Sequence, residues 1–258
     1  MIRLFTYFIN SIKGILYVQT NLPQLVFFPK KILEEQRVYL NKRSYFYSCL
    51  NSKDKIIFEH RVYKFIKGHN FIGNEIEITL EMKTLVAAMA TTLTFGMHKY
   101  LFSQVNSIII YPESYYSTVL KQMHKGETNP KLRLVVFSWI DFLDGVKVKN
   151  DNLNLALHEF SHALHFGFLI NQSYSGLNFK NYYNKILIHL KNKDNQKKII
   201  DANYLREYAF ENQYEFLAVL IEHYFETPEI FKEKLPIIFM YVQKMLNIDI
   251  LKIYKIKY

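Results

Sequence analysis

Three side chains with the chemistry of a metal site lie within five positions, in the run His158-Glu159-Phe160-Ser161-His162. Histidines four positions apart on a helix project from the same face, so both imidazoles can reach a single metal ion. Glu159 follows His158 by one position, which is about 100° further round the helix. Its carboxylate then lies beside the metal, where it can take a proton from a water molecule that the ion activates. The pattern predicts the site of a zinc metalloprotease.

The flanks of this motif favour a helix over residues 153–168. Asp151 and Asn152 are suitable N-cap residues, and Gly167 is a suitable stop. The apolar residues between them indicate a buried helix, which has little reason to carry three histidines and a glutamate unless these side chains have partners. The alternative is coincidence, because so short a pattern also arises by chance.

A catalytic zinc takes three protein ligands and keeps one position open, so a third ligand is needed. His165 lies three positions beyond His162, on an adjoining face that would compress the geometry. Glu215 and Glu222 are seven positions apart in an apolar, helix-forming stretch, and therefore share a face to within about 20°. One of them can bind the metal while the other supports a ligand histidine, and the spacing leaves open which does which.

The remaining pattern predicts an α+β fold that is mostly helical, with a small sheet next to the motif helix. Apolar periodicity predicts helices over 2–18, 30–67 with a break at 51–54, 80–97, 179–191, 214–226 and 229–247 with a hinge near Pro236. Strands are expected at 74–79, 105–111 and 132–139, and a loop is expected at 124–130. We also expect a short helical or irregular piece at 113–124, an insertion over the site at 169–200 and a frayed or strand-like tail at 250–258. We divide the chain into an N-terminal helical segment, 1–50, packed on the core, and a metallopeptidase domain, 51–258.

The predicted strand just before the motif helix has a bearing on substrate binding. Peptides bind in extended form, and an edge strand offers them free backbone donors and acceptors. We take residues 133–138 as the candidate edge strand, with an ordinary internal strand as the alternative.

Composition excludes several classes of function. The net charge is +10, but the lysines are spread along the chain, so no nucleic acid partner is expected. Cys49 is the only cysteine, so no intramolecular disulfide can form, which suits a reducing, cytoplasmic compartment. Residues 1–28 are apolar but interrupted by polar side chains. They predict an amphipathic helix on the core or in peripheral contact with a membrane, and not a membrane span.

Two longer stretches resemble the Mlc titration factor A family of zinc-dependent peptidases. One is Asn154 to Leu164, and the other runs from Tyr208-Ala-Phe-Glu-Asn-Gln-Tyr-Glu215 to Pro228. The run Val135-Val136-Phe137-Ser138-Trp139-Ile140-Asp141 is similar to a third family motif, and the likeness covers roughly residues 55–245. A weaker similarity links the second stretch to the catalytic domain of anthrax lethal factor. The departures are Ser161, His165 and the pair Gln213-Tyr214.

The resemblance implies a gluzincin-type site. His158, His162 and Glu215 would bind zinc, Glu159 would be the general base, and Tyr208 would be a catalytic tyrosine, with Tyr204 a weaker candidate. Glu222 would then support a ligand histidine, or form a salt bridge within the helix pair. The implied activity is hydrolysis of a peptide or protein substrate, with aminopeptidase activity as one form of it. The family also suggests a transcriptional regulator as partner. The alternative function is a regulatory or protein-binding member that keeps zinc with little hydrolysis.

Overall fold

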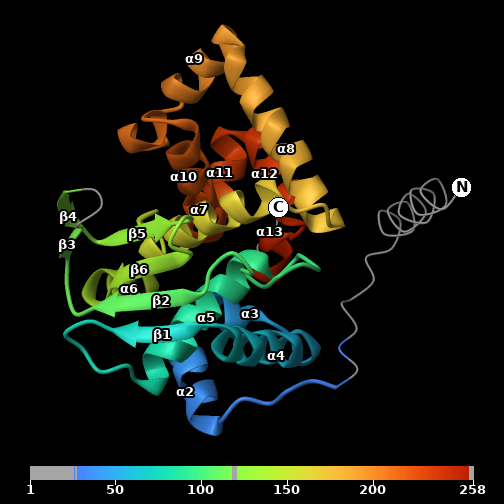
Figure 1. Cartoon of the computed structure of the whole chain (residues 1–258). Helices are drawn as coiled ribbons and strands as arrows, with labels where there is room; N and C mark the ends of the chain where they lie inside the picture. Colours follow the sequence, from blue (N-terminus) through green and yellow to red (C-terminus); the bar gives the residue numbers. More distant parts are fainter. Residues whose placement is uncertain (1–25, 27, 118–120, 256–258) are drawn as a thin grey trace, which may run out of the picture.

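The computed structural model describes residue 26 and residues 28–117 and 121–255, and it shows a mostly helical α+β protein with a small mixed sheet (Figure 1). The N-terminal helices α2–α5 and the C-terminal helices α8–α12 lie at opposite ends of the view, and α7 runs between them. Helix α7 (Leu155–Leu169) contacts the sheet, α5 and α10. The predicted fold class is confirmed at this level.

The sheet has four strands in the order β1 (Asn70–Gly73), β2 (Ser107–Tyr111), β6 (Leu134–Ser138) and β5 (Gly126–Asn129). β1, β2 and β6 are parallel, and β5 runs antiparallel to β6 with Gly126 opposite Phe137. The prediction that residues 133–138 form an edge strand was wrong. Val135, Val136 and Phe137 are all buried, as expected of a central strand covered on both faces, and β5 occupies the edge instead.

Other strand predictions also missed. The alternating run 74–79 forms no strand, and the neighbouring residues of β1 pair with β2 in its place. The expected irregular piece at 113–124 contains two paired strands, β3 (Tyr115–Ser117) and β4 (Gln122–His124), and the expected loop at 124–130 contains β5. The tail forms a short helix, α13 (Ile250–Ile253), capped by Asp249. An alternating pattern becomes a strand only where a partner strand is available, and local sequence does not show the partner.

The N-terminal helices are α2 (Glu34–Arg43), α3 (Tyr45–Cys49), α4 (Ser52–Gly68) and α5 (Leu80–Thr94). Asn51 caps α4 at the predicted break, because its side chain accepts a hydrogen bond from Asp54 N. Leu40, Phe46 and Tyr47 belong to the same buried cluster as the apolar residues of α5 and α7. The predicted helix at 2–18 lies outside the described residues, and the division at residue 50 stays a prediction.

The C-terminal half is helical. It consists of α6 (Trp139–Lys147), α7, α8 (Tyr174–Lys191), α9 (Lys193–Asp201), the 3-10 turn η1 (Glu207–Phe210), α10 (Gln213–Glu226), α11 (Pro228–Lys234) and α12 (Pro236–Leu246). The hinge near Pro236 is confirmed, since α12 begins there. Within the described ranges, no helix combines the length and the apolar character needed to cross a membrane.

Helix α7 starts later and ends later than the sequence indicated. Asn154, and not Asp151 or Asn152, is its N-cap, accepting a hydrogen bond from Leu157 N at 3.0 Å. Gly167 lies inside the helix, where a Cβ would approach Gln104 Oε1 to 2.8 Å. This glycine therefore provides room for a neighbouring side chain and does not end the helix.

Candidate metal centre

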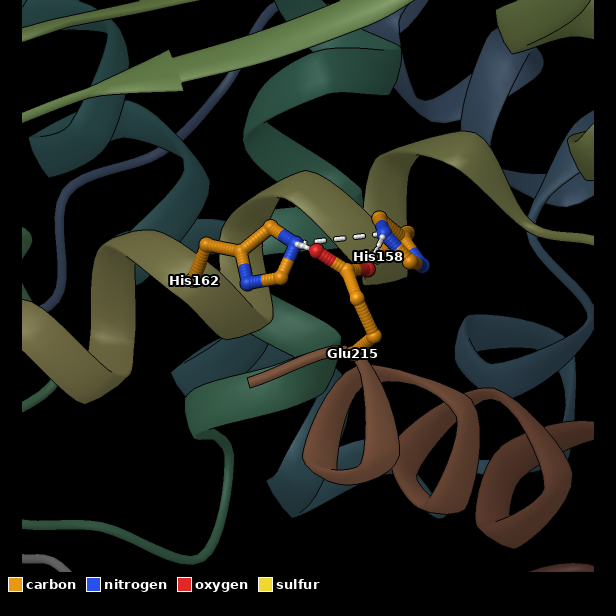
Figure 2. Close-up of side chains that lie close together, drawn as sticks. All are labelled: His158, His162 and Glu215. Carbon is orange, nitrogen blue, oxygen red and sulfur yellow. Dashed lines mark hydrogen bonds and ion pairs between the residues drawn. The ribbon is translucent and has the colours of Figure 1, made fainter. Parts of the chain in front are cut away.

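Helices α7 and α10 bring together His158, His162 and Glu215 (Figure 2). The Nε2 atoms of the two histidines are 3.1 Å apart. Glu215 Oε2 lies 2.9 Å from His158 Nε2, and Glu215 Oε1 lies 3.5 Å from His162 Nε2. One ligand atom from each residue lies within 4.8 Å of the other two, which is close enough for all three to contact one ion.

The start of α10 is fixed by its cap. Asn212 accepts hydrogen bonds from Tyr214 N at 2.8 Å and from Glu215 N at 3.1 Å. These bonds satisfy two of the free N–H groups of the first helical turn. The backbone that carries Glu215 is thereby held in place, and its carboxylate is directed toward α7.

Glu222 lies on the far side of His158. It is only 1% exposed, and its Oε1 lies 2.8 Å from His158 Nδ1. Its Oε2 accepts from Asn154 N at 2.9 Å, so the same carboxylate also holds the N-terminus of α7. A histidine that uses Nδ1–H in this way presents the Nε2 lone pair to the centre, which is the tautomer that a metal ion requires.

Arg206 completes this support. Its Nη2 lies 2.7 Å from Glu222 Oε1 and its Nη1 lies 3.2 Å from Glu222 Oε2. Nη1 also donates to the carbonyl of Asn152, in the segment before α7. Arg206 precedes Tyr208 by two residues, so a single side chain joins the tyrosine turn, the buried carboxylate and the motif helix.

The electrostatics of the centre favour a positive charge between the three side chains. Burial lowers the pKa of His158, but the adjacent carboxylates of Glu215 and Glu222 outweigh it and raise the pKa to about 10. For Glu215, burial acts to raise the pKa, but His158 and His162 hold it well below its usual range. In the absence of an ion, the surrounding carboxylates favour a protonated, positively charged His158.

The donor set fits a metal ion. Glu215 Oε2 is buried and has no partner in hydrogen-bond geometry, although His158 Nε2 is near it. Two imidazole lone pairs and a carboxylate directed at one point repel each other unless a proton or a metal cation lies between them. Two nitrogen donors and one oxygen donor are a usual set for a catalytic zinc.

Glu159 is buried next to the edge strand. Thr128 Oγ1 lies 2.9 Å from Glu159 Oε2 and 2.8 Å from the Glu159 carbonyl. A Cβ on Gly126 would lie 2.8 Å from Glu159 Oε1, so the strand passes directly against this carboxyl group. Burial raises the pKa of Glu159 above its usual value, although His158, His162 and Thr128 act against it.

Tyr208 lies in η1, and its ring centroid is 5.8 Å from that of His158. Burial and the nearby Glu215 raise the pKa of its phenol well above 10, so the hydroxyl keeps its proton at any physiological pH. The side chain is 41% exposed and therefore accessible to a bound substrate. Tyr204 is engaged elsewhere, with its hydroxyl 2.6 Å from Thr227 Oγ1.

His165 is not part of the converging set of His158, His162 and Glu215. It is buried against Tyr183 and Tyr214, with ring centroids 4.7 Å and 5.1 Å away. Burial lowers its pKa to about 4. Its role is packing between α7, α8 and the start of α10.

The sequence reasoning missed four residues around the centre, namely Gly126, Thr128, Asn154 and Arg206. Gly126 and Thr128 were assigned to a loop, and Asn154 was passed over for two other caps. Arg206 lies in an irregular segment, and its position two residues before Tyr208 was the one signal in the sequence for a role at the site. The signal that could have found β5 is its position before a strongly apolar strand with a short connection.

Comparison with known proteins identifies the family of this chain. The family described as glucose-regulated metallo-peptidase M90 matches residues 28–246. The chain belongs to this family. This confirms the resemblance to the Mlc titration factor A family and indicates a metallopeptidase-like role with a bound metal ion. An uncharacterized protein from Synechocystis sp. is 22% identical over 222 residues, covering 77% of this chain and 78% of that protein.

Proposed function

We propose that this protein is a zinc-dependent peptidase with a zincin-like, gluzincin-type site, in which His158, His162 and Glu215 hold the ion. The observation that carries the proposal is the convergence of their ligand atoms within 4.8 Å. Glu222 supports the arrangement by fixing the tautomer of His158. Zinc bound there would polarise the carbonyl of the scissile bond and lower the pKa of water to about 7.

Glu159 is the proton carrier in this proposal. Thr128 bonds one carboxylate oxygen, Oε2, which leaves Oε1 to accept the proton of the attacking water and pass it to the leaving amine. Its buried setting and raised pKa suit this exchange, because a carboxyl group with an ordinary pKa would hold the proton too weakly at neutral pH.

Tyr208 stabilises the negative charge that develops on the carbonyl oxygen. Its hydroxyl remains protonated and can donate a hydrogen bond to that oxygen. Arg206 anchors the turn that carries it through Glu222 and Asn152. The turn that carries Tyr208 is therefore held in position relative to His158 by the Arg206–Glu222 ion pair as well as by its own backbone.

The edge strand β5 is our candidate for substrate binding, in place of residues 133–138. Ser138 N donates to the Lys125 carbonyl, which makes this a hydrogen-bonded pair of the β5–β6 ladder. Along antiparallel strands, hydrogen-bonded pairs alternate with pairs that are not hydrogen-bonded. Gly126 and Thr128 belong to the pairs that are not hydrogen-bonded to β6, so their N–H and C=O groups face the free edge of β5. A peptide added there would pass beside Glu159, which both residues contact.

The test combines metal analysis with hydrolysis. We expect wild-type protein to carry one zinc per chain and to cleave peptides, assayed with amino-acid anilides and with internally quenched peptides. Glu159→Gln should retain zinc and lose about 100-fold or more of kcat. Tyr208→Phe should lower kcat by about 100-fold with little change in KM. Glu207→Gln, a matched change at an exposed carboxylate in the same turn as Tyr208, should leave both unchanged.

Two outcomes oppose the proposal. Zinc retention without hydrolysis in the wild type would favour a regulatory or protein-binding role for the same site. Full activity in Glu159→Gln would exclude this glutamate as the proton carrier.

A further inference from the structure

Helix α7 exposes a narrow apolar stripe that runs through the metal centre. Most residues of the helix are buried, and those that keep part of their surface accessible are Leu155, His162, Phe166 and Leu169. At about 100° per residue, these four lie within about 60° of one another around the helix. The polar member is the ligand His162, and the other three are apolar. A peptide that lies across His162 therefore meets apolar side chains on both sides of this ligand.

The stripe extends from the metal centre to the C-terminal end of α7. Phe166 lies one turn beyond His162, about 6 Å along the axis, and Leu169 lies about 10 Å beyond it. Leu169 is 48% exposed, and the C-cap Ile170 is 72% exposed. An extended peptide advances about 3.3 Å per residue, so a residue one or two positions from a bond held over the metal lies above Phe166.

Tyr214 of α10 forms a wall beside this stripe. Its ring centroid lies 5.9 Å from that of Phe166, and both side chains are partly accessible. Tyr214 immediately precedes the ligand Glu215, and Phe166 follows the ligand His162 by one turn. The two rings therefore stand next to two of the three ligands, where they can bury apolar area against the side chain of a bound peptide.

Buried groups hold Tyr214 in this position. The ring of His165 lies 5.1 Å from that of Tyr214, and the ring of Tyr183 lies 4.7 Å from that of His165. The Tyr183 hydroxyl donates a hydrogen bond to the Gln213 carbonyl at 3.4 Å. Two of the departures from the family pattern, His165 and the pair Gln213-Tyr214, thus meet at this wall. The shape of the wall is therefore a property of this chain's own sequence.

The lining favours an apolar guest over a charged one. Phe166, Leu169 and Tyr214 offer a single hydroxyl group and otherwise apolar surface. A charged side chain would lose hydration against these residues without gaining an ion partner from them. A large apolar side chain would instead gain free energy from the area that it removes from water.

We propose that Phe166, Leu169 and Tyr214 form the subsite that selects the peptide substrate, by accepting a large aliphatic or aromatic side chain within two positions of the scissile bond. This inference rests on the proposed peptidase function and adds a substrate class to it. The subsite acts through the apolar area that it buries. An apolar pocket distinguishes side chains that differ by one methylene group by about 10-fold or more.

The first test is peptide cleavage. Peptide mixtures are digested and the cleaved bonds are identified by mass spectrometry. We expect a large apolar residue at one position near the bond, with kcat/KM about 10-fold or more above that for glycine or lysine at that position. Tyr214→Ala and Leu169→Gln should each lower this ratio about threefold or more. Phe28→Ala, the control, removes an aromatic ring that is 87% exposed near the start of the described chain, and should leave the ratio unchanged.

The second readout does not require catalysis. The hydroxamates of phenylalanine, leucine and glycine share one metal-binding group and differ in their side chains. In calorimetric titration of the zinc-loaded full chain, we expect the first two to bind about 10-fold more tightly than the third. Tyr214→Ala should reduce this difference, and Phe28→Ala should not. Metal analysis checks that each variant holds zinc, and urea unfolding checks that it is folded.

The outcomes distinguish the subsite from the proposed activity. Hydroxamate binding graded by side chain, without peptide hydrolysis, would support the subsite and refute the peptidase. Hydrolysis that ignores the side chain, with equal affinities for the three hydroxamates, would retain the peptidase and overturn the subsite. Unchanged ratios in folded Tyr214→Ala and Leu169→Gln would overturn it as well. A dimer in sedimentation that Leu169→Gln dissociates would assign the stripe to a second copy of the chain, and a chain that takes up no zinc would overturn both proposals.

Discussion

Replacing Glu222 with glutamine removes one charge from the support of the metal centre while keeping the shape of the side chain. Glu222 Oε1 faces His158 Nδ1 at 2.8 Å and Arg206 Nη2 at 2.7 Å, and Oε2 faces Asn154 N at 2.9 Å and Arg206 Nη1 at 3.2 Å. An amide has one accepting oxygen and one NH₂ group. Each carboxylate oxygen of Glu222 faces two donors. In either orientation of the amide, its NH₂ group therefore replaces one of these oxygens and faces two donors without an acceptor.

The magnitude follows from burial. Breaking a buried charge pair by changing one partner costs about 3–5 kcal/mol of unfolding free energy. The Arg206 side chain is 27% exposed and can regain water, so we expect a loss near the lower limit, about 3 kcal/mol. The orientation of His158 loosens as well, and loss of such a supporting carboxylate typically weakens metal binding about 10–100-fold.

Two measurements check this reasoning. Zinc affinity is obtained by competition with a chelator, and the unfolding free energy by urea titration of the metal-free protein. Glu207→Gln serves as the control, since this carboxylate is exposed and near Arg206 in sequence. A zinc affinity within twofold of wild type, in a variant that does unfold more easily, would show that Glu222 stabilises the fold without positioning His158.

Two further perturbations follow from the structure. Gly126→Ala should force Leu155 and the Glu159 carboxyl group to shift, because a Cβ there would lie 2.7 Å from Leu155 Cδ1 and 2.8 Å from Glu159 Oε1, and should lower kcat about tenfold with zinc content unchanged. Gly68→Ala, where a Cβ meets nothing within 4 Å, is its control, and equal kcat values in the two variants would contradict the packing argument. Glu226 has a folded pKa of about 8 against an ordinary 4.5, so the folded protein binds the extra proton between these values. Stability should therefore fall as pH rises from 4.5 to 8, by no more than about 5 kcal/mol, and Glu226→Gln should remove this part. Urea unfolding of both proteins at pH 5 and pH 8.5 measures the difference, and parallel pH profiles would refute it.

Local sequence predicted the helices well because their apolar periodicity extends over many residues. The predicted helix at 214–226 matches α10, and the hinge at Pro236 coincides with the start of α12. Proline and asparagine act through their own backbone and side chain, so Asn51 could be placed without knowing the fold.

The strands were harder because pairing decides them. Gly126 and Asn129 are typical loop residues, and they form a strand because β6 lies beside them. The run 74–79 alternates correctly, but among the described residues its backbone makes only the bond from Asn74 N to the Ile110 carbonyl with the sheet and forms no strand. The consequence is functional, since the strand next to Glu159 is β5 and not β6.

By itself the sequence determined the chemistry available to this protein: two imidazoles and a carboxylate on one helix, and two further carboxylates seven positions apart on another. Helical geometry is local, so this much follows from spacing. The sequence could not decide whether Glu215 or Glu222 binds the metal. The two residues are two turns apart, so they share a face of the helix and differ only in position along its axis, by about 10 Å. Only the crossing of α7 and α10 decided that Glu215 meets both Nε2 atoms while Glu222 meets the far nitrogen of His158. The tertiary structure alone also decided the roles of Arg206, Thr128 and the edge strand, because their contacts join segments that are close only in the folded chain.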